Sequence, residues 1–572
     1  MARGENIVRT LPLKERLEKR LGALKTERSS FEDHWRSLSE FVKPRRSRFF
    51  SQDRNKGDRR YSNIVNSAAT RAHRTAQAGM FNGIMSPSRP WFVLEDADDP
   101  EIMEFAPVKQ WYFLVQELLR RVAVESNLYE VAPNIIGDDL LYATAVMTHE
   151  DHSENLAHFR SLPIGSYAIS QDDFGRVNTV IREYEMTAEQ IVSKFSERGE
   201  ISENISIAVR DAYNRGDYDT WFPVIHHIDE NPEFRVGSNK PRQRRFRSVY
   251  YEPGRERNGE RVLSERGFNE MPAYVPRWDT TGEDIYGTDS PGMIALGDVR
   301  QLQFQEREKG KGLAKMVTPP LQGPVGLRNV PIDQVPGGTT IFDAGGDQRG
   351  LRSVYEVRLP INELREDIKE VEQRINEAFF VDLFLAISAM EGVQPRNQLE
   401  LTQRNQERLI QLGPVLQRTN RDMLDPMIDR LFMQAQRANL LPPPPPEIEG
   451  RPIRIRYVSM LAMAQQALET GNIDRLMNFA VLLAGLGWEG ALEKIDSEQA
   501  VDEYAGLIGA PPRLIVPDDI VEERRQARAE QEQAQLQLEQ MQQSAQAVRT
   551  AGDTKVTDET VAGRVVDNLQ QR

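Results

Sequence analysis

Residues 267–303 read GFNEMPAYVPRWDTTGEDIYGTDSPGMIALGDVRQLQ, and this stretch decides how we expect the chain to fold. Prolines, aromatic residues and turn formers in its first half indicate a strand that ends in tight turns. Ser290 is a good N-cap residue, and Pro291 takes the first helical position, where the missing N–H of proline is not needed. The stretch therefore predicts a strand that passes into a long helix.

Two long helices follow this junction and enclose a shorter segment. They are expected over residues 291–316 and 361–390, which makes them ~39 Å and ~45 Å long at 1.5 Å per residue. Prolines and paired glycines between them predict a small β-rich insert with tight turns. The second helix has an apolar seam, spaced by three and four residues, which predicts a near-parallel helical neighbour. The seam consists of Ile361, Leu364, Ile368, Val371 and Ile375.

The remaining patterns predict an α+β fold. Helices are expected over residues 13–42, 63–85 and 108–125, and antiparallel strands over most of residues 143–278, with a helix inserted at 187–198. A helix at 399–439, a polyproline spacer at 442–446 and a strand at 453–457 follow. Near the C-terminus, a thin seam of small and apolar residues fits either close packing in an assembly or a solvated single helix, and the residues after it are expected to be disordered.

Composition describes a soluble globular chain. Its 572 residues are 39% hydrophobic and 28% charged, and the mean hydropathy is -0.57. The length suits roughly four domains of about 150 residues or one elongated subunit. The absence of cysteine excludes disulfides and thiolate metal sites and fits a reducing compartment. No secretion signal is visible, and the longest apolar stretch, 378–390, is shorter than the about 20 residues that a bilayer requires.

The net charge of -14 works against tight nonspecific binding to nucleic acid, because a tight binder presents Lys and Arg to the phosphates. A DNA-handling protein with this charge is expected to hold DNA loosely.

Histidines and glycines offer no convincing catalytic, metal or cofactor site. His149 and His152 lack the spacing of a His-Glu-x-x-His motif, and we interpret their segment as a solvated hairpin turn. His226 and His227 are expected on opposite faces of a strand, where they pack rather than chelate. Lys311 follows a glycine but lacks the rest of a phosphate-binding loop. We therefore predict that the chain is not an enzyme.

A stripe of charges is expected on each long helix. The first helix carries cations at Arg300, Arg307, Lys311 and Lys315, and the second carries Glu363, Asp367, Glu370 and Glu377 opposite its seam, interrupted by Arg374. Three interpretations remain open. Both stripes can be solvated, the basic stripe can pair with the acidic stripe of a neighbouring helix, or one stripe can face a DNA channel.

Several ordered motifs together resemble the head-to-tail connector (portal) proteins of short-tailed, double-stranded DNA phages. The first stretch contributes residues 272–278, 282–283, 286–287, 290–291 and 295–296. Gly79-Met80 before the Ser-Pro-x-x-Pro-Trp-Phe turn at 86–92, and the order of motifs from 412 to 465, match as well. The resemblance covers residues 16–466. Gln303 departs from it, since the family often has Asn there, and so do residues 394–397, where a Thr/Ala-rich segment is usual.

The resemblance implies a non-enzymatic ring, usually of twelve subunits, at one capsid vertex of the virion. Double-stranded DNA would pass through it nonspecifically. The implied partners are the packaging ATPase (terminase), tail adaptor proteins, and capsid and scaffold proteins, with assembly in the host cytoplasm and no membrane. The implied parts are a wing (1–288), a stem helix (289–316), a clip (317–360), a second stem helix (361–390), a tunnel loop (391–398), a return helix with the crown (399–515), and a C-terminal barrel helix with a disordered tail (516–572).

Six residues are candidates for facing the channel and its DNA: Gln394, Arg396 and Asn397 in the tunnel loop, and Arg307, Lys311 and Lys315 on the first stem helix. The loop side chains can touch phosphates singly, while a glycine and a proline set a bend at which the loop can swing. A static helix corner is the alternative for the loop. For the whole chain, the alternative function is a virion tail or scaffold protein without a DNA channel.

Overall fold

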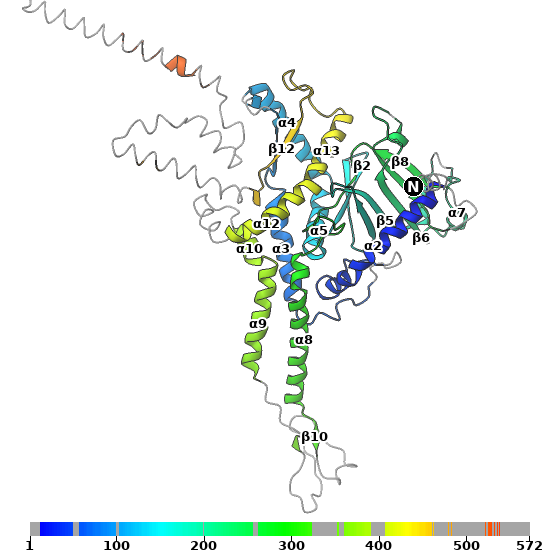
Figure 1. Ribbon diagram of the computed structural model, residues 1–572, viewed down its shortest axis with the longest axis vertical. Helices are drawn as coiled ribbons and strands as arrows, with labels where there is room; N and C mark the ends of the chain where they lie inside the picture. The colour runs from blue at the N-terminus through cyan, green and yellow to red at the C-terminus, as the bar shows by residue number, and fades with distance from the viewer. Residues whose placement is uncertain are drawn as a thin grey trace, which may run out of the picture. The chain divides into compact units, whose positions relative to one another are not determined.

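The computed structural model describes residues 12–49, 57–98, 102–103, 105–197, 200–238, 240–254, 261–322, 352–353, 360–389, 406–459 and 461–462, with isolated positions between 479 and 537 (Figure 1). Contacts divide the chain into two compact units. The first comprises Met1–Val93, Val115–Leu441 and Tyr457–Leu492, and the second comprises Leu94–Leu114, Pro442–Arg456 and Glu493–Arg572. The predicted tunnel loop, most of the insert and most of the predicted barrel helix lie outside the described residues.

Four helices precede the sheets: α2 (Leu13–Phe41), α3 (Ala68–Met85), α4 (Ala106–Glu125) and α5 (Leu128–Tyr142). The predictions for α2 and α4 are confirmed. α3 begins at Ala68 rather than at residue 63; just before it, the side chain of Asn66 accepts the Ala68 N–H at 2.9 Å. The sequence pattern does not reveal α5, since its second half is buried on all sides and shows no amphipathic period.

Two antiparallel sheets follow, and they confirm the predicted α+β class. The five-stranded sheet has the order β4-β5-β6-β7-β8, with bounds Tyr167–Gln171, Val177–Thr187, Trp221–Glu230, Phe246–Tyr251 and Ser264–Phe268. The three-stranded sheet has the order β3-β2-β9, in which β2 is Val146–His152, β3 is Leu156–Leu162 and β9 is Ala273–Tyr274. A short 3-10 helix, η2 (Pro241–Gln243), lies between β6 and β7.

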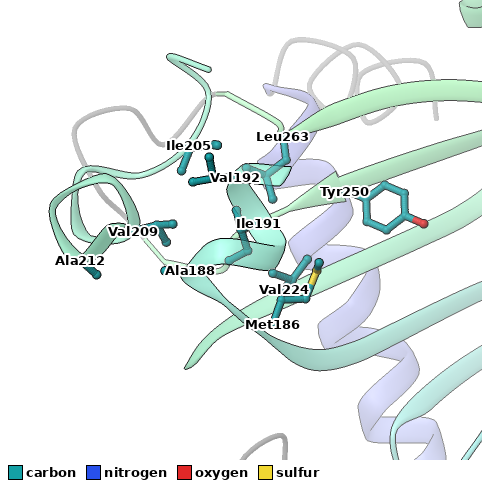
Figure 2. Packing of buried hydrophobic residues seen from close by; sticks show 10 residues of the cluster. All are labelled: Met186, Ala188, Ile191, Val192, Ile205, Val209, Ala212, Val224, Tyr250 and Leu263. Carbon is teal, nitrogen blue, oxygen red and sulfur yellow. The ribbon is translucent and has the colours of Figure 1, made fainter. Parts of the chain in front are cut away.

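Helices cover both faces of the five-stranded sheet. On one face lie α6 (Ala188–Phe195), a shorter form of the predicted helix at 187–198, and α7 (Ile207–Asn214), which the sequence pattern did not predict. Figure 2 shows their apolar side chains with Val224 and Tyr250 of the sheet. On the other face, Leu17 and Leu21 of α2 pack in a second cluster that includes Ile225. Val224 and Ile225 serve different clusters because successive strand residues point to opposite faces.

The first long helix is confirmed as α8 (Pro291–Val317), whereas the prediction of one continuous helix over 361–390 is wrong. The chain instead forms α9 (Ile361–Ala378) and α10 (Val381–Ala389). Phe380 between them has a φ of 54°, in the left-handed region. Packing explains the break: Phe379 is buried with its ring 6.0 Å from that of His73, and Phe384 of α10 seats directly against Gly79 of α3.

The base of the insert is described, although residues 323–351 are not. There β10 (Leu321–Gln322) pairs antiparallel with β11 (Arg352–Ser353). The pair joins the two ends of the insert beyond α8 and before α9.

The predicted return helix is described from residue 406. It consists of α12 (Gln406–Thr419), a π-helical turn η4 (Asn420–Leu424) and α13 (Asp425–Arg437). In the second unit, β1 (Phe92–Asp96) and β12 (Ile453–Tyr457) form a two-stranded sheet, which confirms the strand predicted at 453–457. Trp111 Nε1 of that unit donates to the Pro442 carbonyl at 3.0 Å.

The junction before α8 is held against the end of α5 by backbone contact. Ser290 Oγ accepts the Met293 N–H at 3.3 Å, as expected of an N-cap, and also donates to the Leu141 carbonyl at 3.0 Å. A methyl group on Gly292 would lie 2.7 Å from that same carbonyl oxygen, and one on Gly287 would lie 2.0 Å from the Ala143 oxygen. Only glycine therefore fits where the chain passes α5.

We expect Gly292→Ala to destabilise the folded chain by about 1–3 kcal/mol, because the added methyl group meets backbone that has no room to yield. Gly310→Ala is the matched control on the same helix. Nothing lies within 4 Å of its added methyl group, so the substitution should stabilise by about 0.5–1 kcal/mol through helix propensity. Denaturant unfolding of both variants measures the difference, and shifts of equal sign and size would contradict this account of the junction.

Candidate functional site

α8 and α9 form a helical hairpin, which we call the stem (Figure 1). Ile368, Val371 and Ile375 of the predicted seam are buried, as are Val299 and Leu302 on α8. The other two seam residues, nearer the insert, are exposed or only partly buried. The predicted helical neighbour of this seam is thus α8 of the same chain, over the half of the stem that lies away from the insert.

Two polar contacts align the stem helices. Arg374 Nε of α9 donates to Asp298 of α8 at 3.0 Å, and Gln305 of α8 donates to Asp367 of α9. The residue numbers rise on one helix as they fall on the other, so the helices are antiparallel. Arg374 and Asp367 therefore flank the contact between the helices, and Asp367 does not belong to the outer acidic stripe in which the sequence pattern placed it.

The structure describes three of the six predicted channel residues, all of them on α8. Gln394, Arg396 and Asn397 lie outside the described residues. Arg307 Nη2 donates to the Asn63 carbonyl at 3.0 Å, so it is bound by a loop of its own chain.

The other two cations are on the surface of α8. Lys311 Nζ lies 2.7 Å from Glu308, one turn earlier, and both side chains are about half or more exposed. Lys315 is exposed and has no hydrogen-bond or ion-pair partner among the described residues. These two lysines are available to an external partner, whereas Arg307 is already engaged.

A group of charges fixes the return helix to the stretch that precedes α8, and one of its ion pairs is buried. Arg277, which is only 2% exposed, lies 3.6 Å from Asp422 in the π-helical turn. One turn away, Arg418 lies 2.6 Å from Asp279 and donates to the Trp278 carbonyl at 2.7 Å. The sequence pattern missed this group, because its members are more than a hundred residues apart in the chain.

Asp139 of α5 lies beside this group and is 2% exposed. Its pKa is raised to about 8, chiefly by burial and also by the negative charges of Asp422 and Asp138, while Arg418 and Arg277 oppose the shift. Its Oδ1 has no hydrogen-bond partner. The side chain is therefore protonated at neutral pH.

The histidines are packing residues, and one of their predicted environments is wrong. His149 does not lie in a solvated turn but in the middle of β2, fully buried, with Nδ1 2.7 Å from the Tyr274 hydroxyl. His226 and His227 on β6 are buried on opposite faces, as predicted, and the ring of His226 stacks on that of Tyr250 at 3.8 Å.

Within the described part of the chain, no three His, Cys, Asp or Glu side chains are grouped so that they could hold a metal ion. Among the same residues, no helix has both the length and the apolar character to cross a membrane.

A model of the family described as bacteriophage head to tail connecting protein matches residues 14–516. The chain belongs to this family. It is 37% identical to the portal protein of Salmonella phage epsilon15 over 547 residues, covering 95% of this chain and 96% of that protein. It is 38% identical to a probable portal protein of Bordetella phage BPP-1 over 550 residues, covering 95% and 97%.

A solved structure, the neck of an empty GTA particle computed with C6 symmetry, matches 78% of this chain and 95% of that one, at 14% identity and a TM-score of 0.32. A likeness at this TM-score carries no weight for the fold of the connector chain.

Gln303, where the connector family often has Asn, fastens the stem to the loop before α3. Its Oε1 accepts the N–H groups of Val65 and Asn66 at 2.7 and 2.9 Å, and its Nε2 donates to the Asn66 carbonyl at 2.8 Å. Asn66 in turn donates to Glu306 of α8 and Glu372 of α9, at 3.2 and 2.9 Å. The side-chain amides of Gln303 and Asn66 together thus tie the loop to both stem helices.

We expect Gln303→Ala to cost about 1–3 kcal/mol of stability in this connector chain, because two partly buried backbone N–H groups lose their acceptor. Gln301→Ala provides the control. Gln301 is exposed two residues earlier on α8, and its loss should change stability by less than about 0.5 kcal/mol. Urea unfolding followed by circular dichroism measures both, and an equal effect of the two substitutions would refute the role of Gln303.

Asp139 gives this connector chain a predictable dependence of stability on pH. In the folded chain it keeps its proton up to about pH 8, whereas the unfolded carboxyl has the ordinary pKa of 3.8. The folded state therefore binds more protons between these values, and the contribution of Asp139 to stability falls as pH rises through this window.

Asp139→Asn is neutral in both states, so its stability relative to the unaltered chain should rise steadily from pH 5 to pH 8. Denaturation midpoints of both proteins at three pH values in this range test the expectation. A difference between them that does not change with pH would show that Asp139 is ionised in the folded chain.

Proposed function

We propose that this chain is the portal protein of a bacteriophage. In this role it forms a ring at one capsid vertex, serves as the conduit for double-stranded DNA during genome packaging and ejection, and provides the platform for the packaging ATPase (terminase) and the tail. The observation that carries the proposal is the match over 95% of the chain to proteins named as portal proteins in two phages. The proposed role is structural, and the subunit is a virion component that assembles in the host cytoplasm.

The paired stem helices support a ring of twelve subunits. If one stem helix from each of twelve subunits lines the channel, with the second stem helix of each subunit outside this row, a spacing of about 9 Å gives a circumference of ~108 Å and an axis-to-axis diameter of ~34 Å. After about 10 Å of helix bulk, an opening of ~24 Å remains, through which duplex DNA passes with little clearance. The net charge of -14 supports loose contact with that DNA.

The proposed parts of the ring follow the predicted boundaries. Residues 317–360 are the clip, where the packaging ATPase and later the tail adaptors dock, and the β10–β11 pair closes its base. Residues 391–398 are the tunnel loop, whose Gln394, Arg396 and Asn397 touch passing DNA. Arg307, Lys311 and Lys315 are candidates for the same role, but the two lysines have a second candidate partner in the acidic side of a neighbouring α9.

Electron microscopy and native mass spectrometry of the purified chain test the proposal. We expect a closed ring, with twelve subunits and a central opening that is wide enough for duplex DNA, under the salt conditions of capsid assembly. A tail or scaffold protein without a channel would give monomers, dimers or open assemblies instead. The portal assignment would be overturned if the chain formed only monomers, dimers or open assemblies at every protein concentration up to that of the infected cell.

A further inference from the structure

One face of α8 is exposed along the whole stem. The residues of this face are spaced alternately by three and four, and each is exposed: Ile294, Gly297, Gln301, Phe304, Glu308, Lys311 and Lys315. Ile294 and Phe304 are both 64% exposed, and nothing lies within 4 Å of a methyl group built on Gly297. Large apolar side chains this exposed, in a row on a helix with open space between them, fit a surface that another helix covers.

The outer face of α9 has the opposite charge. Five exposed residues follow the same alternating spacing on the side of α9 away from the buried seam: Glu363, Glu366, Glu370, Gln373 and Glu377. Glu370 pairs with Arg374 on its own helix at 3.3 Å. Glu363 and Glu366 have no hydrogen-bond or ion-pair partner among the described residues. They lie at the start of α9, which is the same end of the stem as Lys311 and Lys315 at the end of α8.

We infer that the exposed face of α8 in one subunit packs against the outer face of α9 in the next subunit, with Lys311 and Lys315 opposite Glu363 and Glu366. The inference rests on the ring proposed above and names its stem contact. Two different, complementary faces on one chain make a head-to-tail contact, and such contacts form a ring when the rotation from one subunit to the next closes. A two-fold contact would instead place lysine against lysine.

Helix dipoles alone do not account for the pattern. Cations at the end of α8 and anions at the start of α9 each stabilise their own helix ends. The helix-dipole effect depends only on charges at the helix ends and does not explain why Phe304 and Ile294 are exposed on the face of α8 that carries the two lysines. The aliphatic stems of the glutamates and of Gln373 on α9 can cover such side chains while the charged groups stay in water.

A pair of charge-reversal variants tests the contact. The α8 variant carries Lys311→Glu and Lys315→Glu, so both of its faces are acidic. The α9 variant carries Glu363→Lys and Glu366→Lys, so both of its faces are basic. Each variant alone should form at least about tenfold fewer rings at low salt, because like charges meet at every contact. Mixed in equal amounts, they should assemble into rings in which the two variants alternate, since every contact then joins opposite charges.

Native mass spectrometry reads the result, because alternation gives rings with equal numbers of the two subunits. One control chain carries all four reversals and should assemble alone, and another carries Lys311→Arg and Lys315→Arg and should behave like the unaltered chain. Circular dichroism of the separate variants checks that each is folded.

The outcomes separate this inference from the portal assignment. If the unaltered chain forms no rings, the proposed function fails. If it forms rings and each reversal variant also does so alone, the stem contact is wrong, and a loss of DNA retention by the α8 variant would then place the two lysines at the channel. If the variants fail alone and mixing does not restore alternating rings, the four residues do not face one another.

Discussion

The stem depends on a backbone contact that permits no side chain. Gly287 and Gly292 pass so close to the end of α5 that an added methyl group would overlap backbone oxygens there. Ser290 caps α8 and bonds α5 at the same place. Because α8 is thereby fixed at its first turn, its direction does not depend on its contact with α9 alone. The two polar contacts and the buried seam then determine how far α9 is displaced along it.

The group of charges around Arg277 secures the other side of the same junction. Arg277 pairs with Asp422 of the π-helical turn, and Arg418 of α12 pairs with Asp279. These pairs hold the return helix against residues 277–279, which lead directly into α8. A buried ion pair is a weak source of net stability, because desolvation offsets most of the attraction. Its geometry is demanding, however, and a misplaced partner leaves a charge unpaired. The protonated Asp139 fits this balance, since a further negative charge beside Asp422 would be costly. The group of charges therefore contributes more to the position of the return helix than to the stability of the fold.

Features that depend on neighbouring residues, such as helix starts and strand alternation, could be predicted from the sequence. Ser290 and Pro291 marked the start of α8 correctly, and strand alternation gave the antiparallel class. The break at Phe380 has no glycine or proline to announce it, and it exists because Phe384 seats on Gly79 of a distant helix. His149 was assigned to a turn because its hydrogen-bond partner, Tyr274, is far away in the chain. For the candidate site, the sequence showed the charged stripes, but only the fold shows which charges α8 and α9 already use internally.

The placement of charges on the stem affects how tightly a DNA conduit binds the DNA that passes through it. A ring with unpaired lysines around its channel would neutralise many phosphates at once and bind DNA through counterion release. Lysines that face the glutamates of a neighbour contribute little net charge to the channel. Salt bridges of this exposed kind are individually weak, but a closed ring repeats each contact once per subunit, and no subunit can leave without breaking two of them. The ionic pairing that we propose would thus both hold the ring together and leave the passage free for sliding DNA.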